Sequence, residues 1–311
     1  MKILSLIELP GEVRQLFEIS HDYVPAGSLD PSEATQAAPR AILCAPGGAR
    51  IDAAYLERLP NSVQAIATYS VGYDHIDLGA CRMKGLAVFH TPGVLADAVA
   101  DAAMLLILGA ARRATESIAL LREGKWTGWT PTQLIGFGLA GRTLGIMGMG
   151  GIGSKIAARA RAFGMTIAYS NRRPRAGEVD ASFVADPRAL FVQSDIVVLA
   201  CPSTAETRKF VNATLLAQAK PSLILVNVGR GDLIDDDALI AALSDKRIFA
   251  AGLDVFDGEP KVDPRYFGLQ NLFMLPHIGS STLEARIGMG RLLADGLSEW
   301  EAGGVPANRL V

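Results

Sequence analysis

Short apolar runs recur along the chain and are separated by longer segments that are amphipathic or rich in turn residues. In the first part of the chain these runs are Ile3–Leu9, Ile42–Ala45, Ala65–Tyr69 and Ala87–His90. Further along they are Thr143–Met147, Thr166–Tyr169, Ile196–Cys201, Leu223–Val228, Ala250–Val255 and Leu272–Leu275. Strands that alternate with helical segments are typical of parallel sheets covered by helices. The pattern therefore predicts an α/β protein, and 311 residues are enough for two domains.

Two long helices and one long loop are expected between and after these strands. Asp97–Arg113 is apolar on most sides, which indicates a mostly buried helix. Thr282–Glu301 is the final helix, with Ser280 or Ser281 as its expected N-cap, and glycines follow it. Ala119–Gly138 is predicted to be a loop.

A glycine-rich stretch follows the predicted strand Thr143–Met147 directly. Gly148, Gly150 and Gly153 have the G-x-G-x-x-G spacing. The segment after them predicts a helix with these residues on one face: Ile152, Ile156, Ala160 and Phe163. In such a loop the glycines permit a tight turn, close approach to a pyrophosphate and close helix–strand packing, and the helix N-terminus attracts phosphate. The flanking strand and helix favour dinucleotide binding over an ordinary turn, although the glycines alone leave a flavin possible.

The end of the next strand bears on which dinucleotide is bound. A site for NAD usually has Asp or Glu here to bind the ribose 2′-OH. This chain instead has Asn171, Arg172 and Arg173. Guanidinium groups suit a 2′-phosphate, so we expect NADPH to be preferred, with NAD possible. The alternative interpretation is a solvated basic turn.

Three polar residues follow strands of the second half of the chain. Arg230, Glu259 and His277 lie in the segments Asn227–Asp232, Gly252–Pro260 and Leu275–Ser281. Singly they could be a surface arginine, a turn residue and a core histidine. Together they can converge at the strand ends of one sheet. Reduction of a 2-keto acid needs a proton donor, for which His is suited, a carboxylate that favours the charged imidazole, and an arginine for the substrate carboxylate.

Composition and charge exclude several other classes of function. The net charge of −2 gives no electrostatic case for a nucleic-acid or membrane partner. The chain has three cysteines, Cys44, Cys81 and Cys201. Because they are few, odd in number and without the spacing of metal ligands, we expect no metal site and a reducing cellular compartment. The most apolar segment, Ala102–Ala111, is far shorter than a membrane span. We therefore expect a cytoplasmic protein.

With these residues in view, the sequence resembles the D-isomer-specific 2-hydroxyacid dehydrogenases, and among them the glyoxylate/hydroxypyruvate reductases. The resemblance covers nearly the whole chain. It rests on five motifs: Ser70–Asp74, Gly148–Gly153, Val228–Gly231, Gly252–Val255 and Pro276–Ser280.

The resemblance implies a role for each of several residues. Arg230, Glu259 and His277 would be the catalytic residues, with His277 as the proton donor. Val71 and Gly72 would bind the substrate carboxylate through backbone N–H groups. The other implied substrate-binding residues are Gly48 and Trp129, together with Arg230. The implied cofactor-binding residues, besides Asn171, Arg172 and Arg173, are Gly148, Met149, Gly150, Gly151, Ile152, Gly153, Cys201, Pro202, Ser203, Val228, Gly229, Asp254 and Gly279.

The resemblance also implies a domain organisation. A flavodoxin-like substrate domain would comprise residues 1–97 and 281–311, and a Rossmann NAD(P)-binding domain, residues 98–280, would be inserted into it. Both would be doubly wound parallel sheets. A homodimer is implied, with Ala98–Phe137 at the interface and Trp129 reaching the partner's active site.

Two positions depart from the commoner family pattern. Val99 stands where a threonine often meets the cofactor phosphates, and Gly151 replaces a larger residue.

The expected activity is NADPH-dependent reduction of small 2-keto acids such as glyoxylate and hydroxypyruvate. The alternatives are a reductase of bulkier 2-keto acids and a non-enzymatic NAD(P)-sensing protein.

Overall fold

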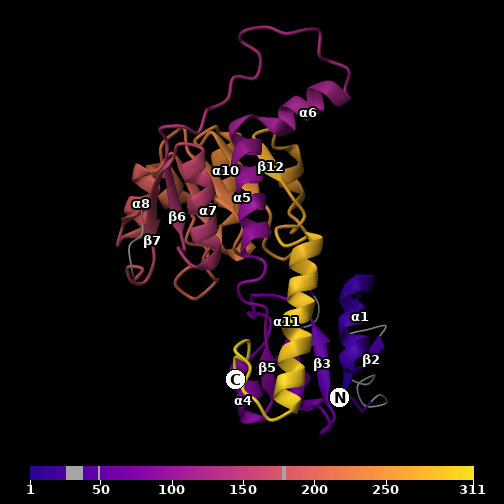
Figure 1. Cartoon of the computed structure of the whole chain (residues 1–311). Coiled ribbons are helices and arrows are strands. Elements are labelled where there is room, and N and C mark those ends of the chain that lie inside the picture. The colour runs from indigo at the N-terminus through magenta and orange to yellow at the C-terminus, as the bar shows by residue number, and fades with distance from the viewer. Residues whose placement is uncertain (26–37, 48–49, 177–179) are drawn as a thin grey trace. The chain divides into compact units, whose positions relative to one another are not determined.

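The computed structural model describes residues 1–25, 38–47, 50–176 and 180–311 (Figure 1). Residue contacts divide the chain into two units, Met1–Leu95 with Ser280–Val311, and Ala96–Gly279. Each unit has one sheet in which all strands are parallel. The prediction of two parallel-sheet α/β domains is therefore confirmed.

The first unit has the flavodoxin-like strand order β2-β1-β3-β4-β5. Its strands are β1 (Lys2–Ser5), β2 (Asp22–Pro25), β3 (Ala41–Cys44), β4 (Ala65–Thr68) and β5 (Ala87–Phe89). All residues of β3, β4 and β5 are buried, as expected for strands covered on both faces. The edge strand β2 has no buried residue and no apolar run, so the hydrophobic pattern did not predict it.

Helices α1 (Gly11–Ser20), α3 (Ala53–Glu57), α4 (Leu78–Met83) and α11 (Leu283–Glu301) complete this unit. Helix α11 buries Met289, Leu293 and Leu297 at intervals of four residues. Its N-cap is Thr282, whose side chain accepts a hydrogen bond from the N–H group of Ala285. The expectation of Ser280 or Ser281 as the cap was wrong because the hydroxyl that reaches the N3 amide belongs to the residue immediately before the helix.

The second unit has the strand order β12-β11-β10-β9-β6-β7-β8. Its strands are β6 (Thr143–Met147), β7 (Thr166–Ser170), β8 (Ser182–Phe183), β9 (Ile196–Leu199), β10 (Ile224–Asn227), β11 (Ala250–Leu253) and β12 (Leu272–Met274). This is the doubly wound Rossmann order, extended by one strand, in which the direction of winding reverses between β6 and β9. The short edge strand β8 is exposed and was not predicted.

Helices α5 (Ala96–Ala111), α6 (Ala114–Arg122), α7 (Gly151–Ala162), α8 (Pro187–Gln193), α9 (Ala213–Gln218) and α10 (Asp236–Ser244) belong to the second unit. Helix α5 is mostly buried, as predicted. Arg159 of α7 forms ion pairs with Asp97 and Asp101 of α5, at 3.1 and 2.6 Å. These contacts join the helix that follows the glycine stretch to its neighbour.

Two helix predictions need correction. Phe163 does not share the buried face of α7, because the helix ends at Ala162 and Phe163 is its exposed C-cap residue. The expected loop 119–138 begins inside α6, whose last residue is Arg122. No residue of α6 is buried, so this helix lacks the amphipathic burial pattern by which the other helices were recognised.

Candidate active site

The polar groups of the second unit gather at the carboxyl ends of its strands. The glycine loop follows β6, and Cys201, Pro202 and Ser203 follow β9, on the two sides of the point where the strand order reverses. Ligands of open α/β sheets bind in the crevice at such a point. The sheet therefore brings the predicted cofactor-binding segments to one edge.

The glycine loop has the geometry that a pyrophosphate requires. Gly148 has a φ of +104°, and a Cβ there would meet the backbone of Ala200 and Cys201 at 2.7 Å. A Cβ on Gly153 would lie 2.2 Å from the carbonyl oxygen of Gly148, so only glycine permits this close packing of helix on loop. At Gly150 an added Cβ would meet nothing within 4 Å, so the backbone there is open to a ligand. The first turn of α7 adds N–H groups without intrahelical acceptors.

Asn171 and the two arginines lie at the end of β7. The side-chain oxygen of Asn171 accepts a hydrogen bond of 2.7 Å from the N–H group of Met149. This hydrogen bond fixes the end of β7 to the glycine loop. It does not use the side-chain NH₂ group of Asn171. Arg172 and Arg173 are exposed and remain accessible to an anion.

His277 and Glu259 form a hydrogen-bonded pair. The Nδ1 atom of His277 lies 2.5 Å from Oε1 of Glu259, and Oε2 of Glu259 accepts from the N–H group of Phe256 at 3.2 Å. The hydrogen bond to Glu259 raises the pKa of His277, although burial opposes it. Burial raises the pKa of Glu259, but the hydrogen bond from His277, the charges of His277 and Arg230 and the hydrogen bond from the N–H group of Phe256 together outweigh burial, so the pKa lies below its usual value. The pair therefore favours imidazolium beside carboxylate.

Asp254 holds the backbone that carries His277. The side chain of Asp254 is buried, and its two oxygens accept hydrogen bonds of 2.8 Å from the N–H groups of Ile278 and Gly279. Its carbonyl oxygen accepts from the N–H group of His277, also at 2.8 Å. His277 has a φ of +54°, a left-handed conformation that costs free energy in a non-glycine residue. The three hydrogen bonds that Asp254 accepts stabilise this strained backbone.

Arg230 follows β10 in a tightly packed loop. A Cβ on Gly231 would lie 1.9 Å from the carbonyl carbon of Phe256, so the loops after β10 and β11 pack directly against each other. The side-chain nitrogen of Asn227 donates to the carbonyl oxygen of Arg230 at 2.8 Å. The positive charge of Arg230 is close enough to lower the pKa values of both His277 and Glu259, as a lesser effect than their mutual hydrogen bond. The structure thus brings Arg230, Glu259 and His277 together.

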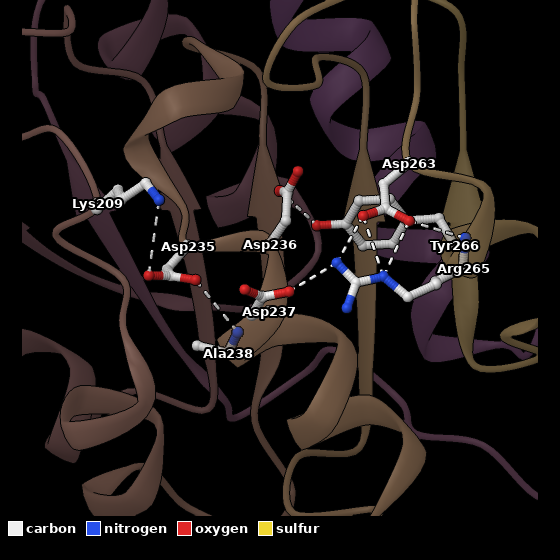
Figure 2. Close-up of polar contacts among 8 residues, drawn as sticks. All are labelled: Lys209, Asp235, Asp236, Asp237, Ala238, Asp263, Arg265 and Tyr266. Atoms are coloured by element: carbon white, nitrogen blue, oxygen red, sulfur yellow. Dashed lines mark hydrogen bonds and ion pairs between the residues drawn. The ribbon is translucent and has the colours of Figure 1, made fainter.

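The segment that follows Glu259 is anchored to the start of α10 (Figure 2). Arg265 pairs with Asp263 and Asp237, each at 2.6 Å, and the Tyr266 hydroxyl donates to Asp236 at 2.7 Å. These contacts hold the C-terminal end of the loop that carries Glu259 against the start of α10. Within the described ranges, no three His, Cys, Asp or Glu residues are arranged to hold a metal ion.

The substrate-binding predictions in the first unit fall on two loops. Gly48 lies outside the described residues. Val71 and Gly72 follow β4, and both are partly exposed. Among the residues that the structure describes, none accepts a hydrogen bond from the N–H group of either. Both amides are therefore able to bind an anion.

Large apolar side chains are exposed on α6 and the segment after it, which project from the second unit in Figure 1. Trp129 is 81% exposed and Leu121 is 62% exposed. Such a group of apolar side chains is typical of a surface that contacts another protein.

Comparison with known proteins defines the family. Residues 104–279 match the model of the D-isomer specific 2-hydroxyacid dehydrogenase, NAD binding domain. The chain belongs to the D-isomer-specific 2-hydroxyacid dehydrogenase family. A glyoxylate reductase from Thermococcus litoralis is 43% identical over 265 residues, which are 83% of this chain and 80% of the relative.

Solved structures agree with the match to this dehydrogenase family. A protein from Polaromonas sp. JS6 66 assigned to the same family has a TM-score of 0.92 and 42% identity, over 100% of this chain and 99% of that one. An NADPH-dependent glyoxylate/hydroxypyruvate reductase from Sinorhizobium meliloti, solved with NADP and malonate, has a TM-score of 0.89 and 31% identity, over 100% and 96% of the two chains. The resemblance seen in the motifs is thereby confirmed.

Some features of this dehydrogenase were not apparent from its sequence. The sequence pointed to Asp254 as a cofactor contact, whereas the structure also shows it bonded to the loop of His277. Cys201 carries a neutral thiol, because burial raises its pKa to about 11. Within the described ranges, no helix combines the length and hydrophobicity needed to cross a lipid bilayer.

Proposed function

We propose that this dehydrogenase reduces small 2-keto acids to D-2-hydroxy acids with NADPH, and that His277 donates the proton. The observation that carries the proposal is the 2.5 Å contact between His277 and Glu259 at the strand ends of the dinucleotide-binding sheet. A reduced nicotinamide, when bound, supplies the hydride. The protein must then bind and orient the keto acid and supply a proton to its oxygen.

His277 is suited to the proton transfer. The carbonyl oxygen gains negative charge as the substrate carbon is reduced, and an imidazolium can protonate it near neutral pH. Glu259 accepts at Nδ1, so Nε2 is the nitrogen that carries the transferable proton. Asp254 fixes the backbone of His277, which keeps the ring in one place during the reaction.

The substrate carboxylate needs cationic and N–H donors. Arg230 would bind the carboxylate and polarise the carbonyl, since a guanidinium makes strong charge-assisted hydrogen bonds to both. The N–H groups of Val71 and Gly72 would bind the same carboxylate. The proposed cofactor-binding residues belong to the unit Ala96–Gly279, and Val71 and Gly72 belong to the other unit.

The residues present fit a dinucleotide with a 2′-phosphate. Gly148, Gly150 and Gly153 leave room for the pyrophosphate, and Asn171, Arg172 and Arg173 stand where the 2′ position of the ribose is bound in this fold. The remaining predicted cofactor contacts belong to the same proposal: Met149, Gly151, Ile152, Cys201, Pro202, Ser203, Val228, Gly229, Asp254 and Gly279. The absence of a carboxylate at the end of β7 favours NADPH over NADH.

The relatives support a small substrate and the exposed apolar surface supports a homodimer. The Thermococcus litoralis relative is named glyoxylate reductase, and the Sinorhizobium meliloti relative glyoxylate/hydroxypyruvate reductase. We extend these substrates to this chain. The exposure of Leu121 and Trp129 fits an interface between two copies, in which Trp129 contributes to the substrate pocket of the partner.

A panel of 2-keto acids tests the proposal. Oxidation of NADPH and of NADH is followed by absorbance with glyoxylate, hydroxypyruvate, pyruvate and phenylpyruvate. We expect the highest kcat/KM with glyoxylate or hydroxypyruvate and with NADPH. Preference for phenylpyruvate would favour a reductase of bulkier acids, and NADPH binding without any turnover would favour a sensing protein.

A further inference from the structure

Three consecutive peptide units in the loop after β4 are each held at the carbonyl oxygen. The carbonyl of Ser70 accepts from the N–H group of Thr91 at 2.9 Å. The carbonyl of Val71 accepts from Nδ1 of His90 at 3.0 Å. The carbonyl of Gly72 accepts from the Ser70 hydroxyl at 2.5 Å. The backbone of this loop is therefore fixed from the carbonyl side.

The N–H groups of the same peptide units differ from the carbonyl groups in this respect. Among the described residues, none accepts a hydrogen bond from the N–H group of Val71, Gly72 or Tyr73. In a trans peptide the C=O and N–H bonds point in opposite directions, so a donor that fixes the carbonyl also fixes the direction of the N–H bond. Successive N–H groups in a turn can bind an anion. The orientation of these donors thus depends on the groups that hold the carbonyls.

We propose that His90 is a positioning residue for the substrate, which acts through the Val71 carbonyl to hold the N–H group of Gly72 toward the carboxylate. The inference rests on the proposed role of Val71 and Gly72 in binding that carboxylate. His90 itself makes no contact with the substrate.

His90 is well placed for this task because its own position is tightly defined. Its backbone N–H group donates to the carbonyl of Asn308 at 3.1 Å, and its carbonyl accepts from the side-chain nitrogen of Asn308 at 3.2 Å. Asn308 is buried. The His90 ring packs edge-on against Tyr73, with ring centroids 5.7 Å apart. Since a carbonyl only accepts, Nδ1 is the protonated nitrogen that donates this hydrogen bond to Val71.

A second set of hydrogen bonds fixes the neighbouring peptide in the same way. The Ser70 hydroxyl uses its one proton on the Gly72 carbonyl, so it must accept from the Thr68 hydroxyl, 2.8 Å away. Thr68 must then accept from Nε2 of His75 at 3.1 Å. The donor of each hydrogen bond in this series is therefore defined. The series ends at the Gly72 carbonyl, in the peptide unit that carries the N–H group of Tyr73.

Two variants of His90 separate the donor from the ring. His90→Phe keeps an aromatic ring beside Tyr73 and removes the donor, whereas His90→Asn places an amide N–H at the position of Nδ1. With NADPH saturating, His90→Phe should raise the KM for glyoxylate about three- to tenfold, the effect of one net hydrogen bond. The KM for NADPH should not change, and His90→Asn should restore the KM for glyoxylate.

Serine variants provide a matched control. Ser5 at the end of β1 donates to the carbonyl of Ile7 at 2.8 Å, the same i to i+2 contact that Ser70 makes in the loop after β4 of the same sheet. Ser70→Ala should raise the KM for glyoxylate, and Ser5→Ala should not. This pair also decides the matter if His90→Phe does not fold.

Binding of oxalate gives a readout that does not require turnover. Calorimetric titration of sodium oxalate into the NADPH-bound protein should give a Kd that rises about three- to tenfold in His90→Phe and recovers in His90→Asn. If the parent binds oxalate but reduces no keto acid, the proposed function fails while the inference stands. If His90→Phe and the parent bind oxalate equally, or if the KM values for glyoxylate and NADPH rise together, or if the parent binds no oxalate, the inference is overturned.

Discussion

Replacement of Glu259 by Gln tests how His277 acquires its proton. The variant keeps the shape and one acceptor oxygen for Nδ1 but removes the negative charge. A hydrogen bond between charged groups contributes about 1.5–3 kcal/mol in general. The side chains of His277 and Glu259 are 42% and 32% exposed, so water weakens the interaction, and we take about 1–2 kcal/mol.

That energy should appear as a rate that depends on pH. The hydrogen bond to Glu259 raises the pKa of His277, so reduction falls as pH rises through this raised pKa. Without the charge the pKa falls, and the alkaline limb of kcat/KM moves to lower pH. At pH values above the alkaline limbs of both proteins, kcat/KM of the variant should be about 5–30-fold lower than that of the parent, the equivalent of 1–2 kcal/mol. Below both limbs the two rates should converge.

The assay is kcat/KM for glyoxylate reduction across the pH range, repeated for oxidation of the hydroxy acid. Oxidation needs the neutral imidazole, so its acid limb should also move to lower pH in Glu259→Gln. Asp257→Asn is the control. It removes an exposed carboxylate from the same loop, and this carboxylate is not among the groups that shift the pKa of His277. A ratio of parent to variant that stays constant with pH would refute the coupling of Glu259 to His277.

Three further variants have defined outcomes. Arg230→Ala should cost about 3 kcal/mol in kcat/KM for glyoxylate, because a charge-assisted contact to the substrate is lost; a variant within about threefold of the parent would remove Arg230 from the mechanism. Neutral replacements of Arg172 and Arg173 should raise the KM for NADPH at least about tenfold and leave that for NADH unchanged, whereas equal effects would indicate only a solvated turn. Trp129→Ala should change the preference among keto acids without altering cofactor affinity, and an active monomer by light scattering would contradict its role across a dimer.

The parts of the fold that were predictable are those whose cause is local in sequence. The strands β6 and β9 are continuous apolar runs, and Gly148 and Gly153 follow the first at the spacing that a tight turn and close helix packing require. The strand β8 escaped prediction because it is exposed and pairs only at the sheet edge. For such a strand the hydrophobic pattern carries no signal.

The contacts that set the chemistry were harder to predict because they join residues far apart in sequence. His277 and Glu259 could be named from their motifs, but the hydrogen bonds that Asp254 accepts from the N–H groups of Ile278 and Gly279 depend on how two loops pack. The contact between His90 and Val71 likewise joins the ends of two neighbouring strands. No spacing in the sequence specifies either contact.

The central claim is most directly tested by reduction of hydroxypyruvate with NADPH by the parent and by His277→Gln. The parent should oxidise NADPH and form D-glycerate. His277→Gln should bind NADPH with unchanged affinity and lose about 10²–10⁴-fold in kcat/KM, the typical contribution of a positioned acid. A parent that forms no glycerate, or a His277→Gln variant that forms it at the parental rate, would contradict the account.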